Sequence, residues 1–182
     1  MGMAATIPYY TVEDLENFPE DGNRYELLDG VLLVTPAPSF AHQGVATLLA
    51  AKLSQAVHEP RIARVLAPGA VAVPPRTQLE PDVLVVPLRF ALNSRWQDIT
   101  EHWLAVEVLS RSSRMYDREF KRDAYLKLGV REVWLVDLAD RSVEVSHVPG
   151  ESETVRDTLT WRVPVLDVEV EIQLAEVFAG LE

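Results

Sequence analysis

The stretch Pro81-Asp82-Val83-Leu84-Val85-Val86 decides the fold, because it sets one carboxylate at the start of an otherwise apolar run. The run Leu104-Ala105-Val106-Glu107-Val108-Leu109 repeats this arrangement with an acid inside it. Short apolar runs of this kind, rich in β-branched residues, are typical of buried central strands. A buried carboxylate without a partner is costly. We therefore expect Asp82 and Glu107 to be neutralised, hydrogen-bonded or bound to a cation.

Two acids on neighbouring strands would form an oxygen-rich site suited to Mg²⁺ or Mn²⁺. In that case the carboxylates should lie on the same face of the sheet, roughly 4–7 Å apart. The alternative is structural: Asp82 caps a turn and Glu107 pairs with an arginine. Spacing alone leaves both interpretations open.

Helices and strands are mixed along the rest of the chain, which indicates an α/β (α+β) fold. Asp29-Gly30 suits a tight hairpin turn, and Gly129 is placed to end a helix in the left-handed conformation. The predicted elements are a short helix from Thr11, a hairpin over 25–34, a helix from Ser39, strands at 62–66, 70–73, 82–86, 103–109, 132–138, 143–148 and 168–172, a helix over about 114–128 and a closing helix over 173–181.

The composition limits the chemistry that the chain can perform. It has 182 residues, 48% of them apolar, no cysteine and four histidines. One domain over 1–182 is expected for this length, and thiolate zinc sites, disulfides and cysteine nucleophiles are excluded. No apolar run approaches the roughly 20 residues that span a bilayer, so we expect a cytoplasmic protein.

The charge is unevenly distributed. The whole chain carries −11, yet residues 111–131 hold seven basic and three acidic side chains, a net +4 that leaves −15 for the remainder. A phosphate backbone requires basic groups gathered in this way. The best candidates for phosphate contacts are Arg114, Arg118 and Arg122. The alternative is a solvated amphipathic helix with an Asp–Lys pair, which is common.

On a helix, Asp117, Lys121 and Tyr125 share one face at a spacing of four residues. That face borders an apolar stripe that begins at Phe120 and continues through Ala124. We therefore expect Phe120 and Ala124 to pack against the sheet, with Lys121 at the edge of the buried side. Tyr125 either contacts phosphate or covers the edge of the core.

The ordered set of motifs resembles one known family. It covers about residues 11–178 and consists of Tyr25-Glu26-Leu27-Leu28-Asp29-Gly30, His42-Gln43, Pro81-Asp82-Val83, Val106-Glu107-Val108-Leu109-Ser110, Asp117-Arg118, Lys121, Tyr125, Gly129-Val130 and Glu132-Val133-Trp134-Leu135-Val136-Asp137. It is similar to the Uma-type restriction endonucleases of the PD-(D/E)XK nuclease superfamily. The resemblance implies a restriction-endonuclease-like core, a central mixed sheet flanked by helices, and a Mg²⁺-dependent phosphodiesterase site.

The resemblance also implies roles for individual residues. Asp82 matches the motif aspartate and Glu107 the motif acid, and both would bind Mg²⁺ or Mn²⁺. The superfamily lysine usually lies two residues after the acid, where this chain has Leu109. Lys121 matches a lysine moved to the following helix, and it should point toward the two acids to orient water or stabilise charge.

Other polar residues are better explained by structural roles. Glu26 could add a ligand, but we favour contacts with Arg24 or a backbone group. His42, near a helix start, is expected to be a polar cap or a partner of a site residue rather than a general base. Ser110 and Ser113 are expected to cap. Trp134 is expected in the core.

The resulting hypothesis is a Mg²⁺-dependent DNA endonuclease that leaves a 5′-phosphate. The main alternative is a catalytically silent nucleic-acid-binding or assembly module that retains the fold, which the absence of lysine at Leu109 favours. A carboxylate-metal hydrolase of small phosphoesters would instead require a deep closed pocket. A homodimer or higher homo-oligomer is compatible with cutting both strands, and the sequence leaves the oligomeric state open.

Overall fold

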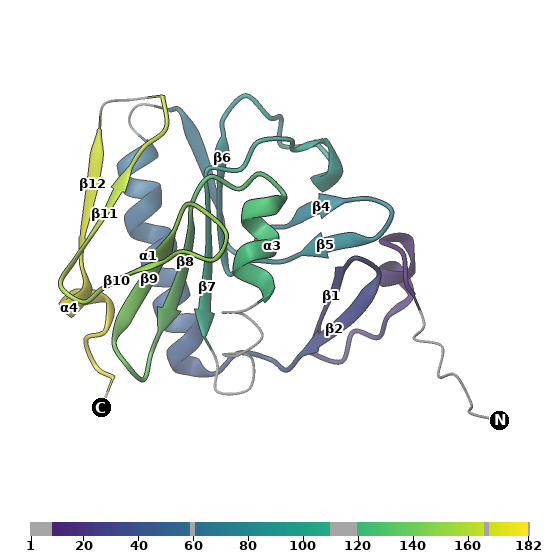
Figure 1. The fold of residues 1–182 in the computed structure, drawn as a ribbon, viewed down its shortest axis with the longest axis horizontal. Helices are drawn as coiled ribbons and strands as arrows, with labels where there is room; N and C mark the ends of the chain where they lie inside the picture. Colours follow the sequence, from purple (N-terminus) through teal and green to yellow (C-terminus); the bar gives the residue numbers. More distant parts are fainter. Residues whose placement is uncertain (1–8, 59–60, 110–119, 166–167, 182) are drawn as a thin grey trace.

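A six-stranded mixed sheet forms the centre of the computed structural model, which describes residues 9–58, 61–109, 120–165 and 168–181 (Figure 1). The strand order is β10-β9-β8-β7-β6-β3. Strands β7 and β8 are parallel, and the other neighbours are antiparallel. The strands are β3 Ala63–Leu66, β6 Val83–Pro87, β7 Leu104–Leu109, β8 Val133–Asp137, β9 Ser142–Ser146 and β10 Glu153–Val155.

A second, four-stranded sheet of order β2-β1-β5-β4 lies beside the central one (Figure 1). Its strands are β1 Arg24–Leu28, β2 Val31–Thr35, β4 Val71–Val73 and β5 Thr77–Leu79. The predicted hairpin is confirmed: Asp29 and Gly30 join β1 to β2 with φ angles of 51° and 84°. Strand β5 was not predicted, since three residues between prolines are too short to establish an alternating pattern.

Among the residues that the structure describes, the remaining elements are two 3₁₀ helices, three α-helices and a two-stranded sheet. They are η1 Glu13–Asn17, α1 Phe40–His58, η2 Trp96–Asp98, α3 Arg122–Lys127, α4 Leu174–Val177, β11 Thr158–Arg162 and β12 Glu169–Gln173. The first helix is a 3₁₀ turn, and the closing helix is shorter than expected. Strand β11 was also missed. The predicted helix over 114–128 is observed at α3, while 110–119 lie outside the described residues.

Alternate residues of the central strands serve two cores, one on each face of the sheet. Val83 and Val106 pack with α1, β11 and β12 on one face. Leu84 and Ala105 pack on the other face with α3 and the small sheet. Trp134 is fully buried in the first core, as predicted. Period-two alternation thus places α1 and α3 on opposite sides of β6 and β7, with both strands buried throughout.

Within the described part of the chain, no helix is both long and apolar enough to cross a membrane.

Gly69 lies so close to Leu84 of strand β6 that a side chain does not fit at this position. A Cβ added to Gly69 would lie 2.5 Å from the Leu84 Cβ, whereas one added to Gly44 on α1 meets nothing within 4 Å. We expect Gly69→Ala to lower the free energy of unfolding by about 1–3 kcal/mol through overpacking. Gly44→Ala should raise it by about 0.5–1 kcal/mol, because alanine has the higher helix propensity. Denaturant titration of both variants measures these changes, and equal effects would contradict the packing described.

Candidate active site

Asp82 and Glu107 lie on the same face of the central sheet. The antiparallel register pairs Val83 with Val106, and one further step places Asp82 opposite Glu107. Residues directly opposite in an antiparallel pair share a face, here the face that α3 covers. Asp82 is 5% exposed and Glu107 3% exposed. Two buried carboxylates therefore converge where β7 ends and β6 begins.

Three donors surround the Asp82 carboxylate. Arg24 Nη2 lies 2.9 Å from Oδ1, His42 Nε2 lies 3.2 Å from Oδ2, and the Val108 N–H donates to Oδ2 at 2.8 Å. Burial alone would raise the pKa of Asp82, but the contacts with His42, Arg24 and Val108 outweigh it and hold the pKa below its usual value. Asp82 is thus an ionised carboxylate held in one orientation.

Lys121 reaches Glu107 from the start of α3. Its Nζ lies 2.8 Å from Glu107 Oε1 and 2.9 Å from Glu26 Oε1, and the residue is 3% exposed. Tyr125, one helical turn later, donates its hydroxyl to Glu107 Oε1 at 2.6 Å. Burial, with the charge of Glu107, raises the pKa of Tyr125 well above its usual value, so this hydroxyl remains a donor.

The expected position of Phe120 is wrong. Ala124 is buried against the sheet as predicted, but Phe120 is 54% exposed. Because Lys121 points inward to Glu107, the residue before it is rotated by about 100° around the helix axis. Leu109, two residues after Glu107, is buried in the core on the α3 side.

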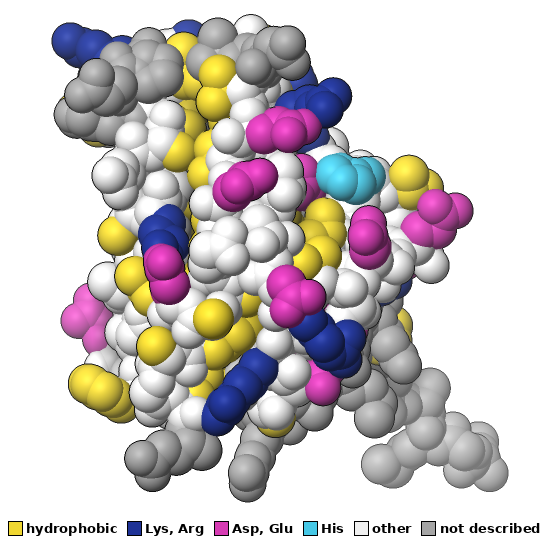
Figure 2. All heavy atoms as spheres, turned by 90° about the vertical axis from the view of Figure 1, so that its left-hand side faces the viewer, with side chains coloured by type: hydrophobic (Ala, Val, Ile, Leu, Met, Phe, Trp, Pro, Cys, Tyr) yellow, Lys and Arg dark blue, Asp and Glu magenta, His cyan; other side chains and the backbone are white. Residues whose placement is uncertain are grey.

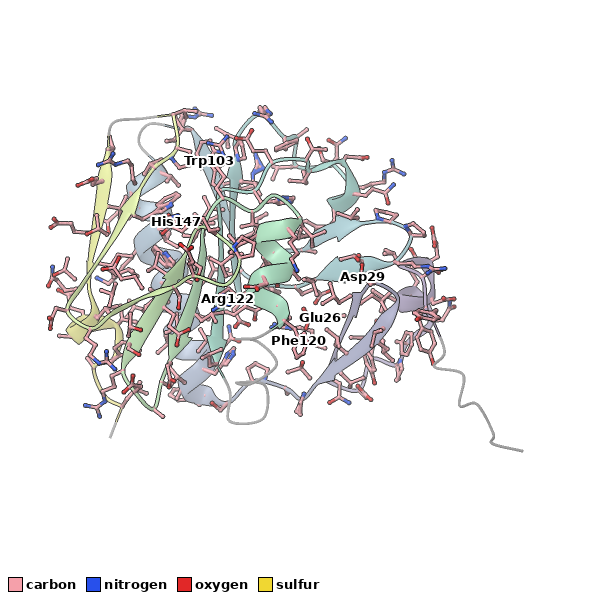
Figure 3. The ribbon with its side chains drawn as sticks, in the orientation of Figure 1. Glu26, Asp29, Trp103, Phe120, Arg122 and His147 are labelled. Carbon is pink, nitrogen blue, oxygen red and sulfur yellow. The ribbon has the colours of Figure 1, made fainter. Side chains whose placement is uncertain are left out.

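Glu26 joins the site, which the sequence left open. Besides its contact with Lys121, Glu26 Oε1 accepts the Glu80 N–H at 2.7 Å, which is the backbone contact that we favoured. Figure 3 shows Glu26 between β1 and the start of α3. His42 likewise joins the site as a partner of Asp82.

Sequence reasoning did not assign Arg24 and Glu80 to the site. The Arg24 Nη1 donates to the Glu80 carbonyl oxygen at 2.9 Å, and the attraction of Asp82 and Glu107 raises the pKa of Arg24 against the effect of burial. Burial and the charge of Glu26 raise the pKa of Glu80. One sequence feature could have identified Arg24: it stands two residues before Glu26 on the same strand, and alternate residues of a strand share a face.

The structure describes only one of the three arginines predicted to contact phosphate, Arg122. Arg114 and Arg118 lie outside the described residues. Arg122 pairs with Asp123 at 2.8 Å and lies on the opposite side of α3 from Glu26 in Figure 3. Tyr125 is fully buried, so in this arrangement it contacts Glu107 and not solvent.

The donor set fits a divalent cation in its chemistry. The carboxylates of Glu26, Asp82 and Glu107 gather around the side chains of Arg24 and Lys121. Carboxylate oxygens are the ligands that Mg²⁺ and Mn²⁺ prefer. Among the described residues no three acidic or imidazole groups converge as a complete ligand set. An ion here would therefore also need water or substrate oxygens, as is usual for Mg²⁺.

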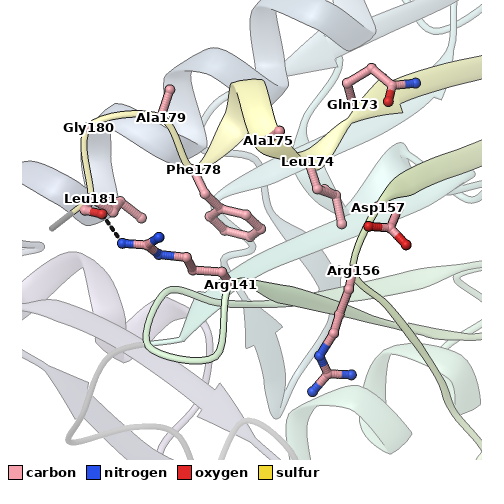
Figure 4. Close-up of a pocket in the computed structure, with 10 residues that line it drawn as sticks. All are labelled: Arg141, Arg156, Asp157, Gln173, Leu174, Ala175, Phe178, Ala179, Gly180 and Leu181. Carbon is pink, nitrogen blue, oxygen red and sulfur yellow. Dashed lines mark hydrogen bonds between the residues drawn. The ribbon is translucent and has the colours of Figure 1, made fainter.

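An open cavity of about 450 Å³ lies elsewhere, at the C-terminal end of the described chain (Figure 4). Arg141 and Arg156 contribute to its lining, and Arg141 donates to the Leu181 carbonyl oxygen. Asp82, Glu107 and Lys121 do not line it. The carboxylate site is therefore separate from this cavity.

The stability of the metal-free protein should depend on the charge of Asp82. Because its folded pKa is lowered from 3.8, ionised Asp82 stabilises the fold above that pH, and the contribution is lost as the pH falls through the folded value. In EDTA, we expect Asp82→Asn to lower the free energy of unfolding by about 3 kcal/mol at pH 7. The difference from wild type should narrow below about pH 4.

Glu80→Gln is the contrasting variant. The pKa of Glu80 is raised from 4.5, so its charge destabilises the fold above that pH, and its removal should raise stability at pH 7 by up to about 1 kcal/mol. Denaturant titrations across the pH range measure both effects. A loss in Asp82→Asn that does not change with pH would contradict the charge argument.

Comparison with known proteins agrees with this architecture. The model of the Uma2 family matches residues 12–177. A crystal structure from Anabaena variabilis, described as "a putative nuclease belonging to DUF820", shares the fold with a TM-score of 0.77 and 20% sequence identity, and the match covers 94% of this chain and 99% of that one. A search of curated proteins found no match. The chain therefore belongs to the Uma2 family, whose description is "Putative restriction endonuclease".

Proposed function

We propose that the protein is a Mg²⁺-dependent DNA endonuclease of the PD-(D/E)XK type, with Asp82, Glu107 and Lys121 as its catalytic residues. The observation that carries the proposal is the contact between Lys121 and Glu107, which lies opposite Asp82. It assembles two acids and a lysine from separate elements, although Leu109 stands where the lysine is usually found. A side chain from α3 can replace one from β7, since only the position of the ammonium group matters to the substrate.

Asp82 and Glu107 would bind the cation, with Glu26 close by through Lys121. Bound Mg²⁺ or Mn²⁺ would act as a Lewis acid toward a phosphoryl oxygen and lower the pKa of a coordinated water. Between two carboxylates, Lys121 is an ammonium group, so it donates hydrogen bonds and does not abstract protons. Its role is to orient the attacking water or to stabilise charge that develops on the phosphate.

DNA would bind through the basic side chains of residues 111–131, the segment in which the sequence concentrates positive charge. Arg114, Arg118 and Arg122 are the proposed phosphate contacts. Figure 2 shows the face that carries β11 and β12, with acidic side chains spread beside basic ones. Phosphates are repelled by such acidic groups, which supports binding of DNA away from this face. Cutting both strands would require a homodimer or two successive events.

The second candidate function is a catalytically silent DNA-binding or assembly module. The contacts of Asp82 favour it, because Arg24, His42 and the Val108 N–H together occupy positions on both carboxylate oxygens. A protein that needs these contacts only for stability would fold, and bind DNA, without metal.

Cleavage assays separate the two candidates. We expect the wild-type protein to cleave DNA with Mg²⁺ or Mn²⁺ and to be inactive in EDTA. Asp82→Asn and Glu107→Gln should each reduce the rate by at least about 100-fold, because loss of charge on a metal ligand removes transition-state stabilisation. Glu169→Gln, which changes an exposed acid of β12, is the matched control and should retain full activity.

Three outcomes would reject the endonuclease proposal. Cleavage that survives in EDTA, or full activity in both site variants, would remove the carboxylate pair from the reaction. Absence of cleavage on varied DNA substrates, together with normal Mn²⁺ binding, would establish the silent module.

Lys121 should affect turnover more than cation binding. We expect Lys121→Met to lower the cleavage rate by at least about 100-fold, with Mn²⁺ binding still measurable by electron paramagnetic resonance. Lys121→Arg keeps the charge but changes the donor geometry, and it should also lose most activity. Lys127→Met, on the exposed side of the same helix, is the control. Unchanged turnover in Lys121→Met would remove this residue from the catalytic set.

A further inference from the structure

Arg24 occupies the position that a cation would take on Asp82. Two groups already meet Oδ2, His42 Nε2 at 3.2 Å and the Val108 N–H at 2.8 Å. On Oδ1, the contact within the described residues is Arg24 Nη2 at 2.9 Å. A metal ion would therefore bind Asp82 most readily through Oδ1, and there it would meet the guanidinium group.

The guanidinium group of Arg24 and a metal ion would compete for Asp82, because both are positively charged. A divalent ion and a guanidinium group on one carboxylate oxygen repel each other, and the repulsion is strong where water is largely excluded. Asp82 is buried, with a side chain 4% exposed, whereas the Arg24 side chain is 23% exposed. The Arg24 side chain is thus the more exposed of the two partners.

Arg24 also has the chemistry to bind a phosphate. Its contacts with the Glu80 carbonyl oxygen and with Asp82 use two of its five N–H groups. The hydrogen bond from Nη1 to the Glu80 carbonyl oxygen holds one side of the guanidinium group in place. Nη2, which contacts Asp82, would lose that contact when a metal ion binds Asp82. A planar guanidinium can contact two phosphate oxygens through a rigid fork of N–H groups, a geometry that an ammonium lacks.

We propose that Arg24 contacts DNA and that the metal site controls this contact. In the metal-free protein its guanidinium group neutralises Asp82. When a divalent cation is bound at Asp82, Arg24 Nη2 would instead contact a DNA phosphate. The inference rests on the proposed endonuclease function. It adds a substrate contact from β1 and a coupling between cation binding and DNA binding. Such coupling is reciprocal, so DNA should tighten cation binding by the same factor.

Binding measurements test this role without relying on cleavage. We expect Arg24→Gln to bind Mn²⁺ about tenfold more tightly than wild type without DNA, because the competing charge is gone. With a fluorescein-labelled DNA duplex, Ca²⁺ should tighten wild-type binding about tenfold over EDTA, and this gain should fall below about twofold in Arg24→Gln. Arg95→Gln, which removes an exposed arginine paired with Asp98, is the control and should match wild type in both assays.

Arg24→Lys keeps the test decisive if Arg24→Gln does not fold. Lysine retains the charge beside Asp82, so Mn²⁺ affinity should stay near wild type. Because its single nitrogen lacks the fork that places separate N–H groups on the Glu80 carbonyl oxygen and on a phosphate, the Ca²⁺-dependent gain should fall at least about threefold. A wild-type gain in Arg24→Lys would then overturn the inference.

The outcomes also separate this inference from the proposed function. Wild-type protein that binds Mn²⁺ and cleaves DNA, together with a folded Arg24→Gln variant unchanged in both binding assays, overturns the role of Arg24 alone. Wild-type protein that neither binds Mn²⁺ nor cleaves DNA overturns the endonuclease function and the inference with it.

Discussion

The buried ion pair between Lys121 and Glu107 is the interaction on which the rest of the site depends. Removing two charges from water costs several kcal/mol per ion, and their attraction compensates only when further hydrogen bonds satisfy both groups. Here Tyr125 also donates to Glu107, and Glu26 also accepts from Lys121. One cluster therefore requires the end of β7, the start of α3 and strand β1 to meet at a single place.

Asp82 imposes a similar constraint from the neighbouring strand. Its partners come from β1, α1 and β7, so the two sheets and the helices on both faces of the central sheet all contribute to the site. Beside these groups, burial and the charge of Glu26 raise the pKa of Glu80. Carboxylate oxygens are suited to a divalent cation, and a lysine and an arginine held beside them are suited to a phosphate.

Local pattern could predict much of this fold, because apolar runs, turn residues and helix ends are short-range features. The hairpin at Asp29-Gly30 and the buried strands β6, β7 and β8 follow directly from them. Strand β5 could not be predicted, since its three residues offer few alternating positions and it is stabilised by its neighbour β4. Strand β11 does alternate in burial along Thr158–Arg162, so its pattern was available in the sequence. Phe120 was assigned to the wrong face because the rotation of α3 is set by the contact of Lys121 with Glu107.

The sequence by itself determined that two acids stand in strands too apolar to leave them without partners, and its ordered motifs indicated the family and the lysine on the helix. Only the tertiary structure decided which groups are those partners. Arg24 meets Asp82 across 58 positions in the chain, and Glu26 meets Lys121 through the packing of the small sheet on the central one. Such contacts depend on how separately formed elements dock, because a charged side chain is compatible with many partners until burial selects one.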